Sequence, residues 1–203
     1  MKLVLATRNA GKIKEFRRIL DDLGSKSIDL LGLKEFPALE DVEETGSSFR
    51  ENALLKAIAT ARETGFPAIA DDSGLCVDAL DGAPGIYSAR WSGEHGDDKA
   101  NLEKVLSQME GVPTEKRNAH FVCVAAVAMP DGRTADEEGI LKGRILTSPI
   151  GVNGFGYDPI FLPEGSDISL AQYDAEAKDA ISHRGQSLRA LAPKIAIMLA
   201  TLG

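Results

Sequence analysis

The sequence predicts an α/β protein built around a mixed, twisted sheet with flanking helices. A short apolar run over residues 2–6 ends at Thr7 and is followed by apolar residues at helical spacing, which indicates a strand–loop–helix unit. Residues 119–129 are almost wholly apolar, which is typical of a central strand covered on both faces. The apolar positions of the first helix are Ile13, Phe16, Leu20 and Leu23.

Helix and strand signals alternate along the rest of the chain. Ser48 and Glu51 have capping-box spacing and precede a predicted helix, and residues 68–70 form the next strand. Asp97 or Asp98 caps a further helix. The apolar stripes of these two helices are Leu54, Ala57, Ile58 and Ala61, and then Leu102, Val105, Leu106 and Met109.

The C-terminal third continues the pattern. Residues 133–146 are expected to form a strand pair, with Gly139 and Gly143 as bends or bulges. The last helix is expected over residues 187–202, and Pro193 predicts a kink or a late start. With 203 residues and neither repeat nor linker, the chain is expected to form one domain over residues 1–203.

Composition narrows the possible functions. A net charge of −8 argues against broad nucleic-acid binding, which depends on Lys and Arg neutralising phosphates. No apolar stretch approaches the roughly 18 residues of a membrane span, and the N-terminus lacks a signal-peptide pattern, so we expect a cytoplasmic protein without membrane partners. Cys76 and Cys123 lie in apolar segments without metal-ligand spacing, which favours buried thiols.

Asp71, Asp72, Ser73 and Gly74 follow the apolar run 66–70 and are the most informative segment. Two carboxylates at the end of a strand suit a hard divalent cation or a water-activating base. The same four residue types are also common in turns, so a plain turn is the alternative.

Three further segments carry chemistry, each with a structural alternative. Residues 7–12, between the first strand and its helix, resemble a phosphate-binding turn, or else a capped turn with a solvated lysine. Residues 151–159 combine glycines with aromatic side chains, as in a nucleobase pocket or a glycine-rich bend. Residues 178–184 gather Lys178, His183 and Arg184, which suit phosphate or a base carbonyl, or else form a solvated charge cluster.

These segments together, in this order, resemble the Ham1 family of inosine triphosphate pyrophosphatases. The resemblance extends from Lys2 to about Leu191 and also includes residues 43–46 and 82–90. It implies an elongated two-lobed fold with a central nucleotide cleft, a homodimer, and Mg²⁺-dependent hydrolysis of non-canonical purine nucleoside triphosphates (ITP, dITP and XTP) to the monophosphate and pyrophosphate.

The resemblance also implies roles for individual residues. Asp72 matches the proton acceptor, and Glu43 is favoured with Asp72 as a metal ligand, although the adjacent Glu44 stays open. The implied substrate contacts are Thr7, Arg8, Asn9, Ala10, Gly11, Lys12, Ser73, Phe155, Gly156, Tyr157, Asp158, Lys178, His183 and Arg184. A pyrophosphatase for altered pyrimidine or other nucleotides and a non-catalytic nucleotide-binding module are the competing hypotheses.

Overall fold

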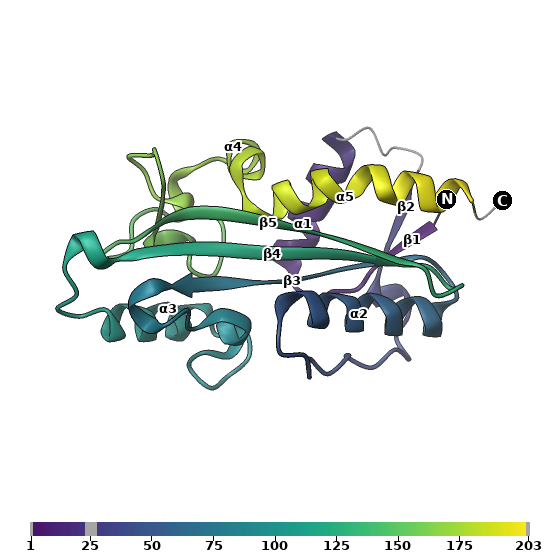
Figure 1. Ribbon diagram of the computed structural model, residues 1–203, viewed down its shortest axis with the longest axis horizontal. Coiled ribbons are helices and arrows are strands. Elements are labelled where there is room, and N and C mark those ends of the chain that lie inside the picture. The colour runs from purple at the N-terminus through teal and green to yellow at the C-terminus, as the bar shows by residue number, and fades with distance from the viewer. Residues whose placement is uncertain (1, 23–27, 202–203) are drawn as a thin grey trace. The chain divides into compact units, whose positions relative to one another are not determined.

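A computed structural model describes residues 2–22 and 28–201 of the chain (Figure 1). Its elements are β1 (Lys2–Leu5), α1 (Ala10–Asp22), β2 (Asp29–Gly32), α2 (Phe49–Thr64), β3 (Ala68–Val77), α3 (Asp98–Gln108), β4 (Asn118–Ala128), β5 (Thr134–Ile145), β6 (Phe161–Pro163), α4 (Ala175–Ile181) and α5 (His183–Ala200). The strand order is β2-β1-β3-β4-β5-β6, with β1 parallel to β2 and β3, and β5 antiparallel to β6. The predicted mixed α/β sheet with flanking helices is therefore confirmed.

The chain divides into two compact units. The first unit comprises Met1–Asp72, Cys123–Gly139 and Arg184–Gly203, and the second comprises Ser73–Val122 and Ile140–His183. Strand β3 belongs to the first unit through Asp72 and to the second from Ser73 onward.

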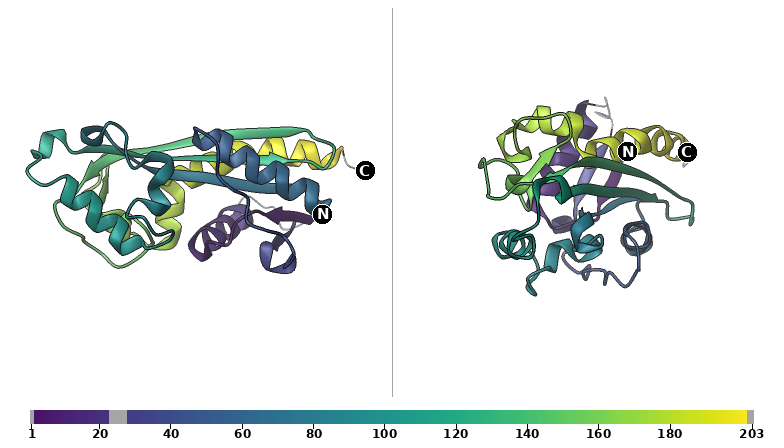
Figure 2. Two further views of the ribbon diagram at one scale, coloured as in Figure 1. Left: turned by 90° about the horizontal axis from the view of Figure 1, so that it is seen from below. Right: turned by 60° about the vertical axis from the view of Figure 1, so that its left-hand side comes forward.

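In the first unit, helices cover both faces of the sheet, as the views of Figures 1 and 2 agree. Leu3, Leu5 and Ile69 pack with residues of α1 and α5 on one face. The residues that alternate with them, such as Val4 and Ala70, pack with α2 on the other face. Because side chains alternate along a strand, each face of β3 meets a different set of helices.

Helix α2 has the small apolar face that close packing on the sheet requires. Its N-cap is Ser48, whose hydroxyl accepts a hydrogen bond from the Glu51 N–H, as the capping spacing predicts. The buried residues of the helix are Asn52, Ala53, Ala57, Thr60 and Ala61. The predicted stripe is only half right, because Ile58 is exposed and Leu54 only partly buried.

The second unit has its own core, in which α3 packs on the strands of that unit. Leu102 and Val105 of α3 and its C-cap residue Met109 share one apolar cluster with Leu75 and Phe121 of the strands. Asp97 is the N-cap of α3, and its carboxylate accepts a hydrogen bond from the Ala100 N–H. This confirms the predicted cap.

Three predictions about elements need correction. Strand β3 does not end before the aspartates but continues through Asp71–Gly74 to Val77, so these residues do not form a turn. Residues 134–145 form one strand instead of a pair. Glycine is needed at position 143 of this strand, because a Cβ would lie 2.3 Å from the Leu162 carbonyl oxygen.

The last helix starts at His183, four residues before the predicted start, and Pro193 lies inside it, so the late start is wrong. The predicted helix positions Leu23 and Leu202 lie outside the described residues. Over residues 2–22 and 28–201, none of the helices has the length and apolar character needed to cross a membrane.

Candidate active site

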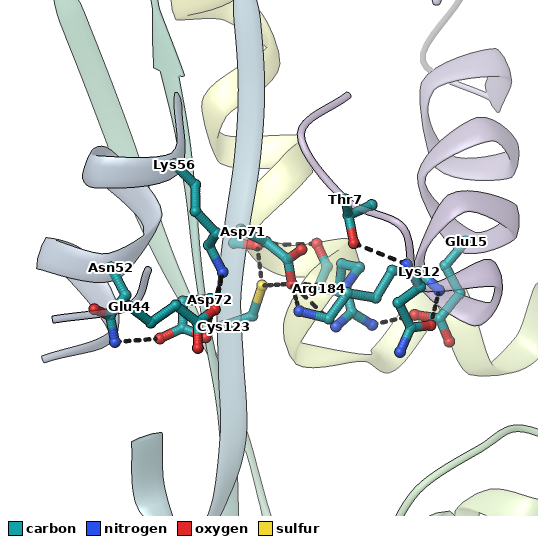
Figure 3. Close-up of polar contacts among 12 residues, drawn as sticks. Thr7, Lys12, Glu15, Glu44, Asn52, Lys56, Asp71, Asp72, Cys123 and Arg184 are labelled. Carbon is teal, nitrogen blue, oxygen red and sulfur yellow. Dashed lines mark hydrogen bonds and ion pairs between the residues drawn. The ribbon is translucent and has the colours of Figure 1, made fainter. Parts of the chain in front are cut away.

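Asp71 and Asp72 are adjacent on β3, and their side chains face opposite sides of the sheet. The ion-pair partners of Asp71 come from α1 and α5, whereas the contacts of Asp72 come from α2 (Figure 3). This follows from the side-chain alternation of a strand and from the helices that cover each face. The two carboxylates therefore have different environments.

Asp71 lies in a buried network of opposite charges. Its Oδ2 atom is 3.0 Å from Lys12 Nζ, 3.2 Å from Arg184 Nη2 and 3.8 Å from Cys123 Sγ. Arg184, which is 2% exposed, also donates a hydrogen bond to Glu15. The two carboxylates and two cations neutralise one another, which is the condition for keeping charges away from water.

The charge state of Asp71 follows from these contacts. Burial by itself would raise the pKa of the carboxyl, but the charges of Lys12 and Arg184 outweigh it and hold the pKa well below its usual range. The carboxylates of Asp71 and Glu15 raise the pKa of Arg184 above its usual value, although burial by itself would lower it. Burial also raises the pKa of the Cys123 thiol to about 12, so this thiol stays protonated at neutral pH. Asp71 is therefore a fixed anion that links α1 to α5.

Asp72 faces α2 and a loop that precedes this helix. Asn52 Nδ2 donates a hydrogen bond to Asp72 Oδ2 at 3.1 Å, and Lys56 Nζ lies 3.7 Å from Asp72 Oδ1. The same ammonium lies 2.6 Å from Glu44 Oε1. Asn52 and Lys56 are four residues apart on α2 and so project from the same side of the helix.

The pKa of Asp72 shifts in the direction opposite to that of Asp71. Burial raises it above the usual range, and Glu44 adds to the increase, while Lys56, Lys12 and the Asn52 hydrogen bond oppose it. A raised carboxyl pKa suits a proton acceptor, and a pair of carboxyls with separated pKa values is typical of acid–base sites.

Asn52 also fixes the loop that carries Glu44. Its Oδ1 accepts a hydrogen bond from the Gly46 N–H at 2.8 Å, while its amide nitrogen donates to Asp72. A Cβ at Gly46 would lie 2.7 Å from Asn52 Oδ1, so only glycine allows this approach. Glu44 is thus held near Asp72 by a residue that sequence reasoning missed.

The predicted phosphate turn, residues 7–12, has several internal contacts. The Thr7 hydroxyl accepts from the Asn9 N–H, and Asn9 Oδ1 accepts from the Lys12 N–H at 3.0 Å. Arg8 binds Asp41 and the Leu39 carbonyl, so its guanidinium is directed to that loop. Ala10 and Gly11 open α1.

The predicted nucleotide-binding segment, residues 155–158, lies in the second unit. Asp158 Oδ2 accepts hydrogen bonds from the Phe155 N–H at 2.9 Å and from Lys178 Nζ at 2.5 Å. The Lys178 ammonium also lies 4.8 Å from the centre of the Phe155 ring. A Cβ at Gly154 would lie 2.0 Å from the Asp158 carboxylate, so this glycine makes room for it. The Asp158 carboxylate therefore joins the Phe155 backbone to the Lys178 ammonium.

The other predicted residues of the second unit have structural contacts too. The Tyr157 hydroxyl donates to the Ser88 carbonyl, and the Gly156 N–H donates to Asp98 Oδ2. His183 is buried, and its ring stacks on Phe121 with an interplanar angle of 8°. Ser73 continues β3 and is partly exposed.

The structure brings together some of the predicted residues and adds others. Lys12, Asp72 and Arg184 all lie in the first unit, around the aspartate pair of β3. Glu44 contacts Lys56 beside Asp72, whereas the neighbouring Glu43 is exposed. Sequence reasoning missed the roles of Glu15, Asn52 and Lys56, whereas the prediction of Cys76 and Cys123 as buried thiols is confirmed. Two signals existed: Glu15 follows Lys12 by three residues on α1, and Asn52 and Lys56 share one face of the Ser48-capped helix.

The donor set around Asp72 fits a magnesium ion. Asp72 and Glu44 both reach the Lys56 ammonium, so one cation can face both carboxylates. Magnesium usually takes one or two carboxylates and completes its shell with water and phosphate oxygens. Within the described part of the chain, no group of three or more His, Cys, Asp and Glu residues could hold a metal by itself. The arrangement suits an ion that arrives with a phosphate ligand.

Two adjacent aspartates on one strand of a mixed α/β sheet, with a lysine from α1 beside one and a lysine from α2 beside the other, define a candidate acid–base site. The sequence profile of the Ham1 family matches residues 3–194, and the chain belongs to this family.

Relatives and solved structures agree with this assignment. The chain is 56% identical to a dITP/XTP pyrophosphatase of Streptomyces avermitilis and 57% identical to one of Streptomyces coelicolor, with 98% of each chain covered. Its fold is similar to that of a HAM1 protein from Coxiella burnetii, with a TM-score of 0.85, 40% identity and coverage of 97% and 98% of the two chains.

Proposed function

We propose that this enzyme hydrolyses non-canonical purine nucleoside triphosphates, namely ITP, dITP and XTP, to the monophosphate and pyrophosphate with Mg²⁺. The observation that carries the proposal is the different surroundings of the two aspartates: Asp71 is a buried anion paired with Lys12 and Arg184, whereas Asp72 lies beside Asn52, Lys56 and the Glu44 loop. Relatives that match nearly the whole chain are named dITP/XTP pyrophosphatases, which supports the substrate class.

Glu44 and Asp72 are the residues that we assign to the metal, with Glu44 in place of Glu43. Held by these two carboxylates, Mg²⁺ would supply positive charge against the pyrophosphate leaving group. Asp72 orients the attacking water towards the α-phosphorus and accepts its proton. Asn52 holds the Asp72 carboxylate in position.

The N-terminal turn and the buried network supply the electrostatics of phosphate binding. The backbone N–H groups at the start of α1 and the Lys12 ammonium favour an anionic ligand, and the Lys12 side chain is 16% exposed. Asp71 fixes Lys12, so this cation needs little reorganisation on binding. Arg184 is held by two carboxylates, so we assign it to this support instead of to direct reading of the base.

Base selection depends on hydrogen-bond polarity. Hypoxanthine and xanthine present an O6 acceptor, whereas adenine presents an N6 donor. A hydrogen-bond donor from His183 or from a backbone N–H pairs with the O6 acceptor of hypoxanthine or xanthine. In adenine the same donor would face the N6 donor, and neither group would be paired. An unpaired buried group costs about 1 to 3 kcal/mol, which corresponds to roughly 10- to 100-fold discrimination per site.

The proposal is tested with a panel of purine and pyrimidine nucleoside triphosphates and Mg²⁺, scored separately for pyrophosphate and orthophosphate. We expect pyrophosphate from ITP, dITP and XTP and little turnover of ATP. Orthophosphate release, or equal turnover of ATP and ITP, would overturn the proposal. Faster turnover of an altered pyrimidine nucleoside triphosphate than of ITP would favour the competing hypothesis of a pyrophosphatase for altered pyrimidine nucleotides.

The resemblance to the family also leads us to propose a cytoplasmic homodimer. Light scattering during size exclusion measures the mass directly, and the chain mass of 21.6 kDa gives the monomer reference. A mass that stays at this value at micromolar concentration would exclude the dimer.

A further inference from the structure

Lys56 lies where a cation between Glu44 and Asp72 would lie. Its ammonium is 2.6 Å from Glu44 Oε1 and 3.7 Å from Asp72 Oδ1, and its side chain is 14% exposed. Figure 3 shows the side chain extending from α2 to the aspartate. A single ammonium thus neutralises both carboxylates that we assign to Mg²⁺.

Two cations cannot share this position. If Lys56 stayed in place, an incoming divalent ion would meet a positive charge within a few ångströms, and at that distance charge repulsion weakens binding strongly. The long, flexible lysine side chain can turn away, whereas Asn52 holds Asp72 and the Glu44 loop by two hydrogen bonds. The carboxylates therefore stay while the ammonium moves.

We propose that Lys56 is an internal competitor of the metal, which fills the cation position between Glu44 and Asp72 and leaves it when a divalent ion binds with nucleotide. The inference rests on the proposed function for the identity of the metal ligands. It gives Lys56 two positions: one against the carboxylates, and one from which its ammonium is available to an anionic substrate. Metal binding is then weak without nucleotide, because the ion must displace the lysine.

The test measures Mn²⁺ binding to the full chain in the absence of nucleotide, by electron paramagnetic resonance of free Mn²⁺. Lys56→Met removes the competing charge at similar volume, and we expect Mn²⁺ affinity to rise by about tenfold. Lys56→Arg keeps the charge and should bind Mn²⁺ like the wild type. Lys99→Met, at an exposed lysine of α3, is the matched control and should change nothing.

A second substitution tests whether the increase in Mn²⁺ affinity depends on Glu44. In the Lys56→Met background, Glu44→Gln should abolish the added affinity, because it removes one of the two carboxylates. Unchanged or weaker Mn²⁺ binding by Lys56→Met would overturn the proposal, and so would a gain that survives Glu44→Gln. Failure of ITP hydrolysis would instead contradict the proposed function without changing these binding constants.

The wild-type chain gives an independent readout that does not depend on any variant folding. Acetic anhydride labelling followed by mass spectrometry reports the reactivity of each lysine. Saturating Mg²⁺ should increase the labelling of Lys56 severalfold relative to Lys99, since displacement exposes the ammonium. Equal labelling of Lys56 with and without Mg²⁺ would show that the lysine is not displaced.

Discussion

Asp71 and Asp72 are consecutive residues whose carboxylates bind helices on opposite faces of one sheet. Asp71 pairs with Lys12 and Arg184, and Asp72 contacts Asn52 and Lys56. The peptide between them thus separates the buried anion of Asp71 from the residue to which we assign proton transfer.

Asp72→Asn should lower the rate of pyrophosphate release from ITP by at least about 100-fold, since positioned proton transfer contributes about 10²- to 10⁴-fold. Nucleotide binding, measured by calorimetry, should persist. Asp21→Asn, at an exposed position of α1, is the matched control and should leave turnover unchanged. Turnover that survives Asp72→Asn would remove Asp72 from catalysis.

Asn52→Ala should lower kcat by about 10- to 100-fold with a small effect on KM, because Asn52 acts by positioning Asp72. The lost hydrogen bond normally lowers the pKa of Asp72, so the acidic limb of the pH–rate profile should shift to higher pH. Asn101→Ala is the matched control, since Asn101 is a buried helical asparagine in the second unit. An equal shift of the limb in both variants would contradict the positioning role.

Asp71→Asn should lower the free energy of unfolding by about 3 to 5 kcal/mol, because it leaves buried cations without their full counter-charge. Urea denaturation measures the loss. Glu137→Gln breaks a partly exposed ion pair with Lys194 and should cost less than about 1 kcal/mol. Similar losses for the two variants would show that Asp71 is not a stabilising anion.

The stabilisation by Asp71 should also depend on pH. Its folded pKa lies below the unfolded value of 3.8, so its contribution is complete above that value and decreases as the pH falls towards the folded pKa. The difference in unfolding free energy between the wild type and Asp71→Asn should therefore be constant from about pH 7 to 5 and about 1 kcal/mol smaller at pH 3. Urea denaturation of both proteins from pH 7 to pH 3 measures this difference. If the difference in unfolding free energy stayed constant down to pH 3, the lowered pKa of Asp71 would be contradicted.

Local signals predicted most of the regular elements. Ser48 and Asp97 cap α2 and α3 as their spacing indicates, and β4 is central because its residues are apolar on both faces. These features depend on nearby residues, so a single sequence is sufficient to find them. The apolar stripe of α2 was less accurate, because close packing on the sheet selected the small residues.

Local signals failed where distant residues decide the structure. Asp71–Gly74 have the composition of a turn, but they extend β3, because lysines and an arginine from other elements neutralise the buried carboxylates. Gly143 marks close packing against Phe161 instead of a bend. Arg184 was expected to contact substrate, and its burial against Asp71 and Glu15 depends on residues more than 100 positions away.

The sequence by itself determined the residue types of the site and their order along the chain. The tertiary structure decided that Asp71 and Asp72 continue β3 and therefore face opposite sides of the sheet. Only the tertiary structure decided which helix covers each side, and therefore which carboxylate is fixed by Lys12 and Arg184 and which meets Asn52 and Lys56. The physical reason is that a carboxyl pKa depends on burial and on charges a few ångströms away. Those charges come from segments that are distant in the sequence, and the fold alone brings them together.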